Sequence, residues 1–389
     1  MISIYSSRFA ENCCCIFAFY KKEEYDVKCF FYLNKEEKWK QTTGQDEDEN
    51  MKIIETYGNY IEKWSNENPG RARWLLKTGW KAQNLKFRFA PDKRLMPADR
   101  YLARLMMDTM LMPLEKPQES AIVSIFTPCE LLQEAGIHPY NVEGFSCYLS
   151  ASKAERAFLQ QAENTGISET LCSYHKTFIG AAQKKVLPKP KCIVYTNLTC
   201  DANLLTFKKL AKMYDVPIFA IDVPMQQNED NVQYVADQLR KLKEFIEKCT
   251  GKKITDEALT ERLRRSKRTL EKFAQYEKES ADKYVPADLV TPLYVGMTNN
   301  LLLGTKEEED YVDRLLKDVK NAPAKKGKKI YWMHTIPFWS DAVKNELCFQ
   351  EKAQIVGCEL SHVCEPDFDP EKPYEAMARR MVYHALNGS

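Results

Sequence analysis

The sequence lacks the marks of several large classes of protein. Its 57 lysine and arginine residues nearly balance its 55 aspartate and glutamate residues, so a net charge of +2 gives no electrostatic reason to expect a nucleic-acid partner. No apolar run reaches the roughly 18 residues that a membrane-spanning helix needs. The apolar segment 13–20 is too short for a span and lacks the basic flank and cleavage site of a signal peptide. We therefore expect a cytoplasmic protein without a membrane partner.

Familiar cofactor and catalytic motifs are also missing. The chain has no G-x-S-x-G, P-loop or G-x-G-x-x-G motif, so neither a nucleotide hydrolase nor a Rossmann dehydrogenase has motif support. Cys172 and Cys200 belong to no C-x-x-C pair, which argues against a zinc ribbon and against a ferredoxin-like cysteine run. An odd number of cysteines, 13, favours reduced thiols, some of them binding metal, over a disulfide framework.

What the sequence does contain is an alternation of strand and helix patterns. Short runs rich in β-branched residues predict strands at 121–126, 192–198 and 216–221. Helical patterns lie among them at 129–135, about 151–162, 169–183 and 203–213. Strands that alternate with helices predict an α/β fold with a parallel sheet and crossover helices. Two long charged helices follow at 229–250 and 255–280, and their polar faces are expected to be solvated surface.

At 389 residues the chain should form two or more domains. We divide it into a poorly packed extension (1–50), a helical segment (51–120), a first Rossmann-like domain (121–228), a second helical segment (229–324) and a second Rossmann-like domain (325–389). The last of these has room for about two strands, and so small a parallel sheet leaves its faces uncovered. We therefore expect the second domain to be incomplete at the C-terminus.

Two cysteines lie at the ends of predicted elements. Cys172 falls in the helical pattern 169–183, and Cys200 follows the strand 192–198, at the carboxyl edge where open α/β sheets bind ligands. Cysteines that arrive singly from different loops suit a metal cluster, although ordinary buried thiols would give the same spacing. A nucleophilic cysteine is a further alternative because His175 would share a helix face with Cys172. We expect His175 instead to be a surface or capping residue.

Glu130 lies at the junction of the first strand and the helix that follows it. A carboxylate at that position could take part in acid–base catalysis or could cap the helix, and capping is the simpler expectation.

The order of these motifs resembles the 2-hydroxyacyl-CoA dehydratase family, which includes 2-hydroxyglutaryl-CoA dehydratase subunits and the related benzoyl-CoA reductases. The resemblance lies in TPCELLQEAGIHP, in LCSYHKTFIGAA and in the strand that runs into CDA, which begin at Thr127, Leu171 and Cys200. The family's opening motif usually reads P-E-E-L. Here Cys129 stands at the first glutamate position and Glu130 matches the second. The likeness extends over roughly residues 51 to 389.

The resemblance implies a subunit with two Rossmann-like domains that holds a [4Fe–4S] cluster by three cysteines, of which Cys172 and Cys200 match two. It implies a heterodimer with a homologous dehydratase subunit and an ATP-dependent iron–sulfur activator protein that injects one electron. The substrate would be an (R)-2-hydroxyacyl-CoA, which loses water through a ketyl radical and gives a 2-enoyl-CoA. Glu130 is carried over as the candidate catalytic residue.

The sequence departs from the family at the third cluster ligand. In the family this cysteine lies beyond the helix that ends here near Leu386, and Cys348, Cys358 and Cys364 match no part of that motif. Two alternatives therefore stay open beside the dehydratase subunit. One is a non-catalytic remnant that cannot hold the cluster, and the other is a benzoyl-CoA reductase-like member of the same family.

Overall fold

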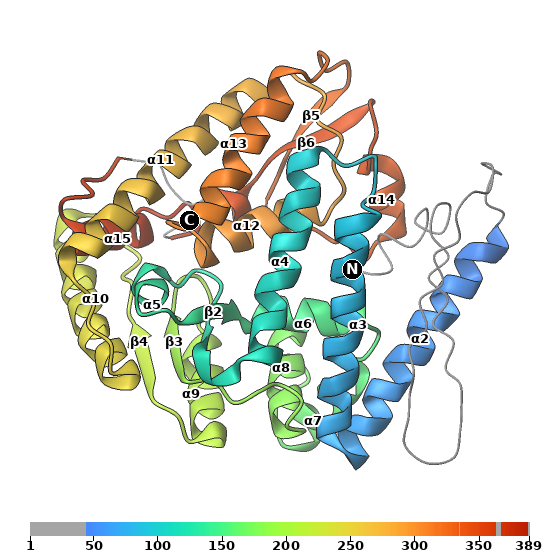
Figure 1. The fold of residues 1–389 in the computed structure, drawn as a ribbon, viewed down its shortest axis with the longest axis horizontal. Helices are drawn as coiled ribbons and strands as arrows, with labels where there is room; N and C mark the ends of the chain where they lie inside the picture. Colours follow the sequence, from blue (N-terminus) through green and yellow to red (C-terminus); the bar gives the residue numbers. More distant parts are fainter. Residues whose placement is uncertain (1–43, 334, 363–366, 388–389) are drawn as a thin grey trace.

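A computed structural model of the protein describes residues 44–333, 335–362 and 367–387. Three long helices come first, α2 (Gly44–Glu67), α3 (Pro69–Phe89) and α4 (Pro97–Glu115), and they pack side by side (Figure 1). Asn68 separates the first two, because its side chain accepts a hydrogen bond from the backbone N–H of Arg71 at 3.2 Å and Pro69 follows as a favourable first helical residue. The helices predicted between 51 and 114 are thus confirmed. Most of the predicted extension 1–50 lies outside the described residues.

A parallel sheet of four strands, in the order β2-β1-β3-β4, forms the centre of the lower half of the molecule in Figure 1. Its strands are β1 (Ser120–Val123), β2 (His138–Asn141), β3 (Cys192–Thr196) and β4 (Ile218–Ile221). The three predicted strands are confirmed, but β2 was missed. This strand contains Pro139, which cannot donate a ladder hydrogen bond and which the structure accommodates because β2 is an edge strand.

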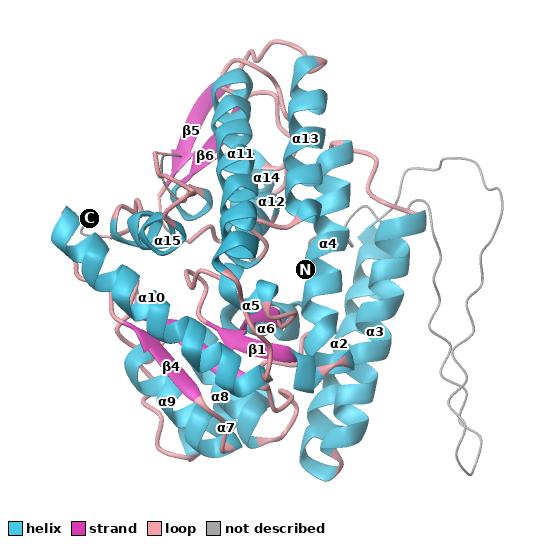
Figure 2. Cartoon of the chain, turned by 60° about the vertical axis from the view of Figure 1, so that its left-hand side comes forward, coloured by secondary structure: helices cyan, strands magenta, loops and turns pink. Residues whose placement is uncertain are grey.

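Helices cover both faces of this sheet. They are α5 (Glu130–Glu134), α6 (Val142–Ala151), α7 (Arg156–Asn164), α8 (Ser173–Gln183), α9 (Asn203–Tyr214) and α10 (Glu229–Thr250). Figure 2 shows α10 on one side of β1 and β4 and the helices α7, α8 and α9 on the other. The helix predicted at about 151–162 corresponds to α7, which begins later, at Arg156, and the helix α6, which ends at Ala151, was missed. Because α6 is buried over most of its circumference, it lacks the polar stripe that reveals a surface helix.

The rest of the chain is mainly helical and ends on a second, smaller sheet. Its elements are α11 (Asp256–Ser280), α12 (Thr291–Leu301), α13 (Lys306–Lys320), β5 (Lys328–Trp332), α14 (Asp341–Leu347), β6 (Ala353–Cys358) and α15 (Pro373–Val382), with short 3₁₀ turns η1 (Pro117–Glu119) and η2 (Glu359–Ser361). Strands β5 and β6 pair in parallel, and Tyr331 and Trp339 near them remain largely exposed. The fold is therefore α/β and mostly helical, with one four-stranded and one two-stranded parallel sheet.

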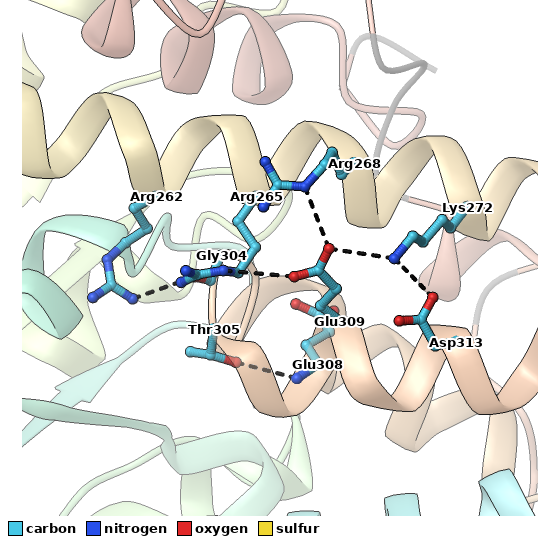
Figure 3. A network of polar contacts seen from close by, with 9 residues as sticks. All are labelled: Arg262, Arg265, Arg268, Lys272, Gly304, Thr305, Glu308, Glu309 and Asp313. Atoms are coloured by element: carbon cyan, nitrogen blue, oxygen red, sulfur yellow. Dashed lines mark hydrogen bonds and ion pairs between the residues drawn. The ribbon is translucent and has the colours of Figure 1, made fainter.

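Much of the polar face of α11 is exposed as expected, but one row of its basic side chains contacts α13. Arg268 and Lys272 on α11 contact the Glu309 carboxylate of α13 at 3.4 and 3.3 Å, and Lys272 also reaches Asp313 at 2.7 Å (Figure 3). Arg265 donates to the Gly304 carbonyl at 3.1 Å. Basic residues one turn apart on α11 thus join α11 to α13 while they remain partly exposed to water. No helix within the described part of the chain is long and apolar enough to cross a membrane.

Candidate functional site

The carboxyl edge of the four-stranded sheet is held rigid by side chains that join neighbouring strand ends. The Ser124 hydroxyl, just after β1, lies 2.8 Å from the Thr127 hydroxyl and accepts the N–H of Thr196 at 3.0 Å. After β3, Asn197 binds Asp222 at 3.1 Å and accepts the N–H of Val223 at 2.8 Å. In a parallel sheet this edge is where ligands bind, and the cross-links position the loops that would hold them.

Cys172 and Cys200 both lie at this edge. Cys172 is the exposed N-cap residue of α8, and the half-buried Cys200 lies between β3 and α9. Burial raises the pKa of Cys200, whereas hydrogen bonds from the N–H groups of Ala202 and Asn203 at the start of α9 oppose that rise. His175, in the first turn of the helix that Cys172 caps, contacts the Cys200 sulfur, so Cys200 lies beside that end of α8. Two thiols from different loops are thus presented at one end of the sheet.

His175 faces Cys200 and is not the surface or capping residue that we expected. Its imidazole is buried because α8 is covered along nearly its whole length, and its Nε2 lies 3.7 Å from the Cys200 sulfur. The Thr206 hydroxyl donates to the Ala202 carbonyl, so it must accept a hydrogen bond from His175 Nδ1 at 2.9 Å. The lone pair of Nε2 is then directed at the thiol. Burial lowers the pKa of His175 to about 4, so the ring is neutral at pH 7.

Glu143 is a residue of this edge that the sequence analysis missed. It lies in the first turn of α6, after β2, and burial raises the pKa of its carboxyl group to about 7. Backbone N–H groups of Glu143 and Ile125 partly oppose that rise. Its charge acts on the thiol of Cys200, which places the two groups in the same electrostatic environment. A carboxyl group that is half-protonated at neutral pH is suited to proton transfer.

Several buried polar atoms at the carboxyl edge have no hydrogen-bond partner in the described part of the chain. Among the described residues, the Oε2 of Glu143, both amide atoms of Asn141 and the Oδ1 of Asn203 are buried and make no hydrogen bond. Most buried polar groups in proteins are hydrogen-bonded, so a group of unpaired ones calls for a polar ligand or water. Asn141 ends β2, and Asn203 begins α9 and donates to the Thr196 carbonyl at 2.9 Å. All three side chains therefore belong to the carboxyl edge.

Glu130 is the first residue of α5 and is buried deeply. Its carboxylate forms an ion pair with Arg380 of α15 and accepts a hydrogen bond from the Ser266 hydroxyl of α11 at 3.3 Å. The side chain thus joins three helices instead of capping α5 as we expected. The sequence analysis could not predict these contacts, because Ser266 and Arg380 lie far from Glu130 along the chain and no local pattern links them to it.

A cavity of about 20 Å³ lies beside this ion pair. Its lining includes Glu130, Arg380 and His384 together with Phe126 and Leu198, which follow β1 and β3. The cavity therefore adjoins the carboxyl edge, and it exceeds the roughly 10–15 Å³ that one water molecule needs. The Nε atom of Arg380 and the Nε2 atom of His384 are buried without partners among the described residues, so polar groups to bind such a water are present.

The other cysteines that could complete a cluster site lie elsewhere or outside the described residues. Cys358 is buried in a small apolar cluster with Leu289 and Ile336, and Cys348 is half-buried just after α14. Cys364 falls outside the residues that the structure describes. Within those residues, no group of three or more His, Cys, Asp or Glu side chains is arranged to hold a metal ion. Together with the buried Cys129, which precedes α5 at the same edge, Cys172 and Cys200 thus form no full ligand set for a [4Fe–4S] cluster among the described residues.

Comparison with known proteins gives a consistent set of matches. The sequence pattern of the family described as "2-hydroxyglutaryl-CoA dehydratase, D-component" matches residues 124–387, a range that includes Glu130, Cys172 and Cys200. The (R)-phenyllactyl-CoA dehydratase alpha subunit of Clostridium sporogenes is 23% identical over 216 residues, which are 52% of this chain and 52% of that protein.

Two further relatives match over shorter ranges. The (R)-2-hydroxyisocaproyl-CoA dehydratase alpha subunit of Clostridioides difficile is 25% identical over 140 residues, 33% of this chain and 34% of that protein. The (R)-2-hydroxyglutaryl-CoA dehydratase subunit alpha of Acidaminococcus fermentans is 26% identical over 91 residues, 22% of this chain and 19% of that protein. The matched part thus spans about half the length of the first curated relative, 52%, and less of the other two.

Proposed function

Because this chain belongs to the 2-hydroxyglutaryl-CoA dehydratase D-component family, we propose that it is a subunit of an iron–sulfur (R)-2-hydroxyacyl-CoA dehydratase. Such an enzyme is a lyase that removes water from a 2-hydroxyacyl-CoA and releases a 2-enoyl-CoA. The observation that carries the proposal is the position of Cys172 and Cys200, which match two cluster ligands of the family and lie at one edge of the sheet. Thiolates are the ligands that iron–sulfur clusters use.

Cys172 and Cys200 would hold a [4Fe–4S] cluster together with a third ligand that the described residues do not identify. When bound, the cluster supplies one-electron chemistry and an iron that can polarise a thioester carbonyl. The Cys200 sulfur accepts hydrogen bonds from the N–H groups of Ala202 and Asn203. These hydrogen bonds would favour its thiolate form, which is the form that binds iron. His175 Nε2, 3.7 Å from the sulfur, faces the Cys200 thiol as a hydrogen-bond acceptor, but with a pKa of about 4 it is too weak a base to keep the proton that Cys200 releases.

We assign proton transfer at this edge to Glu143. Elimination of water moves a β-proton off the substrate and requires a proton for the departing hydroxyl group, so one group that both accepts and donates a proton serves both needs. A pKa of about 7 makes Glu143 competent in both directions at neutral pH. Glu130 has a different role, because its carboxylate is bound by Arg380 and Ser266 and positions the helices next to the edge.

The partners follow from the same family. The relatives are named as alpha subunits, so we propose a heterodimer with a homologous dehydratase subunit. An ATP-dependent iron–sulfur activator would deliver the electron. The names of the relatives contain aromatic, branched aliphatic and acidic 2-hydroxyacyl groups, so acyl-CoA thioesters of these three types are the first substrates to test.

The proposal is tested by anaerobic expression of the chain with its homologous subunit and activator. We expect (R)-phenyllactyl-CoA, (R)-2-hydroxyisocaproyl-CoA or (R)-2-hydroxyglutaryl-CoA to be dehydrated only when ATP, a reductant and the activator are all present. Dehydration in air without the activator would contradict the proposal. Iron and sulfide analysis of this chain purified alone separates an inactive remnant, which would contain neither, from a dehydratase with another substrate.

A further inference from the structure

Strand β5 is an edge strand of the second, smaller sheet. It pairs in parallel with β6, and no other helix or strand in the described part of the chain packs extensively against it. Figure 2 shows β5 on the outer side of the molecule, with β6 between it and α11. The N–H of Lys328 donates to the carbonyl of Lys352, just before β6, at 2.9 Å. Successive residues of a strand direct their N–H and C=O groups to alternate sides, so those of Lys329 and Tyr331 are directed away from β6.

The outer edge of β5 is accessible to water and carries large apolar side chains. In the first sheet, β1 has a neighbour on each side and is buried along its whole length, whereas every residue of β5 is at least partly exposed. Tyr331 in the strand and Met333 directly after it are 59% and 71% exposed. A sheet of two strands is marginally stable by itself, and an accessible strand edge is a template for a further strand. The outer edge of β5 is therefore suited to pairing with another chain.

We propose that β5 pairs antiparallel with β5 of a second copy of this chain, about a two-fold axis at Ile330, so that the two small sheets join into one of four strands. Ile330 is the middle residue of β5, and this register therefore pairs the strand along its whole length. The backbone groups of Lys329 bond to those of Tyr331 in the other copy, and the reverse pair is identical by symmetry. A two-fold contact uses the same surface on both copies and closes on itself. The dimer does not depend on the proposed dehydratase activity.

The distribution of charge along β5 favours this partner and this register. Lysine residues on an edge strand oppose pairing where like charges come opposite each other. About an axis at Ile330, Lys328 lies opposite Trp332 of the other copy. Lys329 likewise lies opposite Tyr331, so each ammonium group comes next to an aromatic ring and no two lysines face each other. An axis moved by one residue, to Lys329, would place that lysine opposite itself.

The experiment uses the full chain purified alone, and sedimentation velocity measures its mass over a wide range of concentration. The wild type should reach twice the 45.2 kDa of one chain. Tyr331→Lys brings a like charge opposite Lys329 and should weaken the dimer by about tenfold, whereas Tyr331→Glu brings a carboxylate opposite the same lysine and should keep it. Both variants should fold, because Tyr331 is largely exposed. A wild type that stays monomeric at every concentration, or two variants that behave alike, would overturn the proposal.

A cross-link tests the register directly. Ile330→Cys brings two identical thiols together in a non-hydrogen-bonded pair with Cα atoms about 4.5 Å apart, which is within the range of a disulfide. Mild oxidation should therefore give a disulfide-linked dimer above the background that the native cysteines give in the wild type. Lys326→Cys is the matched control, because Lys326 is exposed but precedes β5, and it should add no cross-link.

Two further results would contradict the model. A dimer in which Ile330→Cys forms no cross-link would overturn the register. A chain that is monomeric alone and dimerises only with the homologous subunit would overturn the choice of a second copy as the partner.

Discussion

Glu130 and Arg380 form a buried ion pair that joins the start of α5 to the last long helix, α15, across 250 positions of sequence. The side chains are only 1% and 5% exposed, and Ser266 of α11 completes the contact at 3.3 Å. Such a pair is costly to desolvate and still more costly to break, because either partner alone would be a buried, uncompensated charge. The pair therefore determines how α15 docks beside the candidate site.

The first prediction concerns this pair. Arg380→Met should lower the free energy of unfolding by about 3–5 kcal/mol, because it leaves the Glu130 carboxylate buried without a partner. Adding Glu130→Gln to that variant should restore a large part of the loss, since no buried charge then remains. Chemical denaturation of the wild type, both single variants and the double variant measures the coupling. Additive losses in the double variant would show that the pair does not act as a unit.

The second prediction concerns iron binding. Cys172→Ser and Cys200→Ser should each remove most of the iron and sulfide that the anaerobic protein binds, because a hydroxyl group replaces a thiolate ligand. Iron and sulfide are determined after anaerobic reconstitution and desalting. Cys348→Ser is the control and should bind as much iron as the wild type. Wild-type iron content in both the Cys172 and the Cys200 variants would refute their assignment as ligands.

The third prediction separates proton transfer from folding at Glu143. Glu143→Gln should lower kcat by about 100-fold or more, and the rate should lose its dependence on a group of pKa about 7. The same variant should unfold no more easily than the wild type at pH 8, because it removes a carboxylate that is buried against its preference for water. A pH–rate profile and a denaturation curve on the same samples check both statements. An unchanged kcat would exclude Glu143 from the reaction.

The fourth prediction concerns Asp99 of α4, a buried carboxyl group away from the sheet edge. Burial, with the charges of Asp288 and Asp318, raises its pKa from 3.8 to about 8. The folded state therefore keeps a proton that the unfolded chain loses, and stability falls as the pH rises from about 4 to about 8.

Asp99→Asn should remove this loss, so the variant should gain stability over the wild type as the pH rises, by on the order of several kcal/mol at pH 8. Thermal unfolding between pH 5 and 8 measures the slope. The variant also serves as the control for Glu143→Gln, because it changes a buried acid without touching the sheet edge and should keep its kcat. A parallel pH dependence in wild type and variant would contradict the assignment of the proton to Asp99.

The fifth prediction concerns the contact of α7 with α8. A Cβ at Gly180 would lie 1.9 Å from the Phe158 carbonyl oxygen, so Gly180→Ala must force the two helices apart. We expect it to lower the free energy of unfolding by about 1–3 kcal/mol. Gly70→Ala is the control at an exposed helical position, where it should cost less because a Cβ would meet only the Asn68 side chain, at 3.3 Å, and alanine favours helix. Equal stability of the two variants would mean that α7 and α8 can shift without cost.

The sequence by itself determined the parts of the fold that local patterns encode. The strands β1, β3 and β4 and the long helices α10 and α11 follow from apolar periodicity and from start and stop residues, which depend on neighbours within a few positions. The motifs around Cys172 and Cys200 likewise sufficed to indicate the family that the comparison then showed.

The tertiary structure alone decided the pairings. Strand β2 exists because an edge position accepts Pro139, and α6 is hidden from pattern analysis because it is buried on nearly every side. The partner of Glu130 and the contact between His175 and Cys200 depend on which helices pack against the sheet. These pairings share one physical cause. The burial and the pKa of a side chain depend on groups that are near in space, and the spacing of residues along the chain does not show which groups those are.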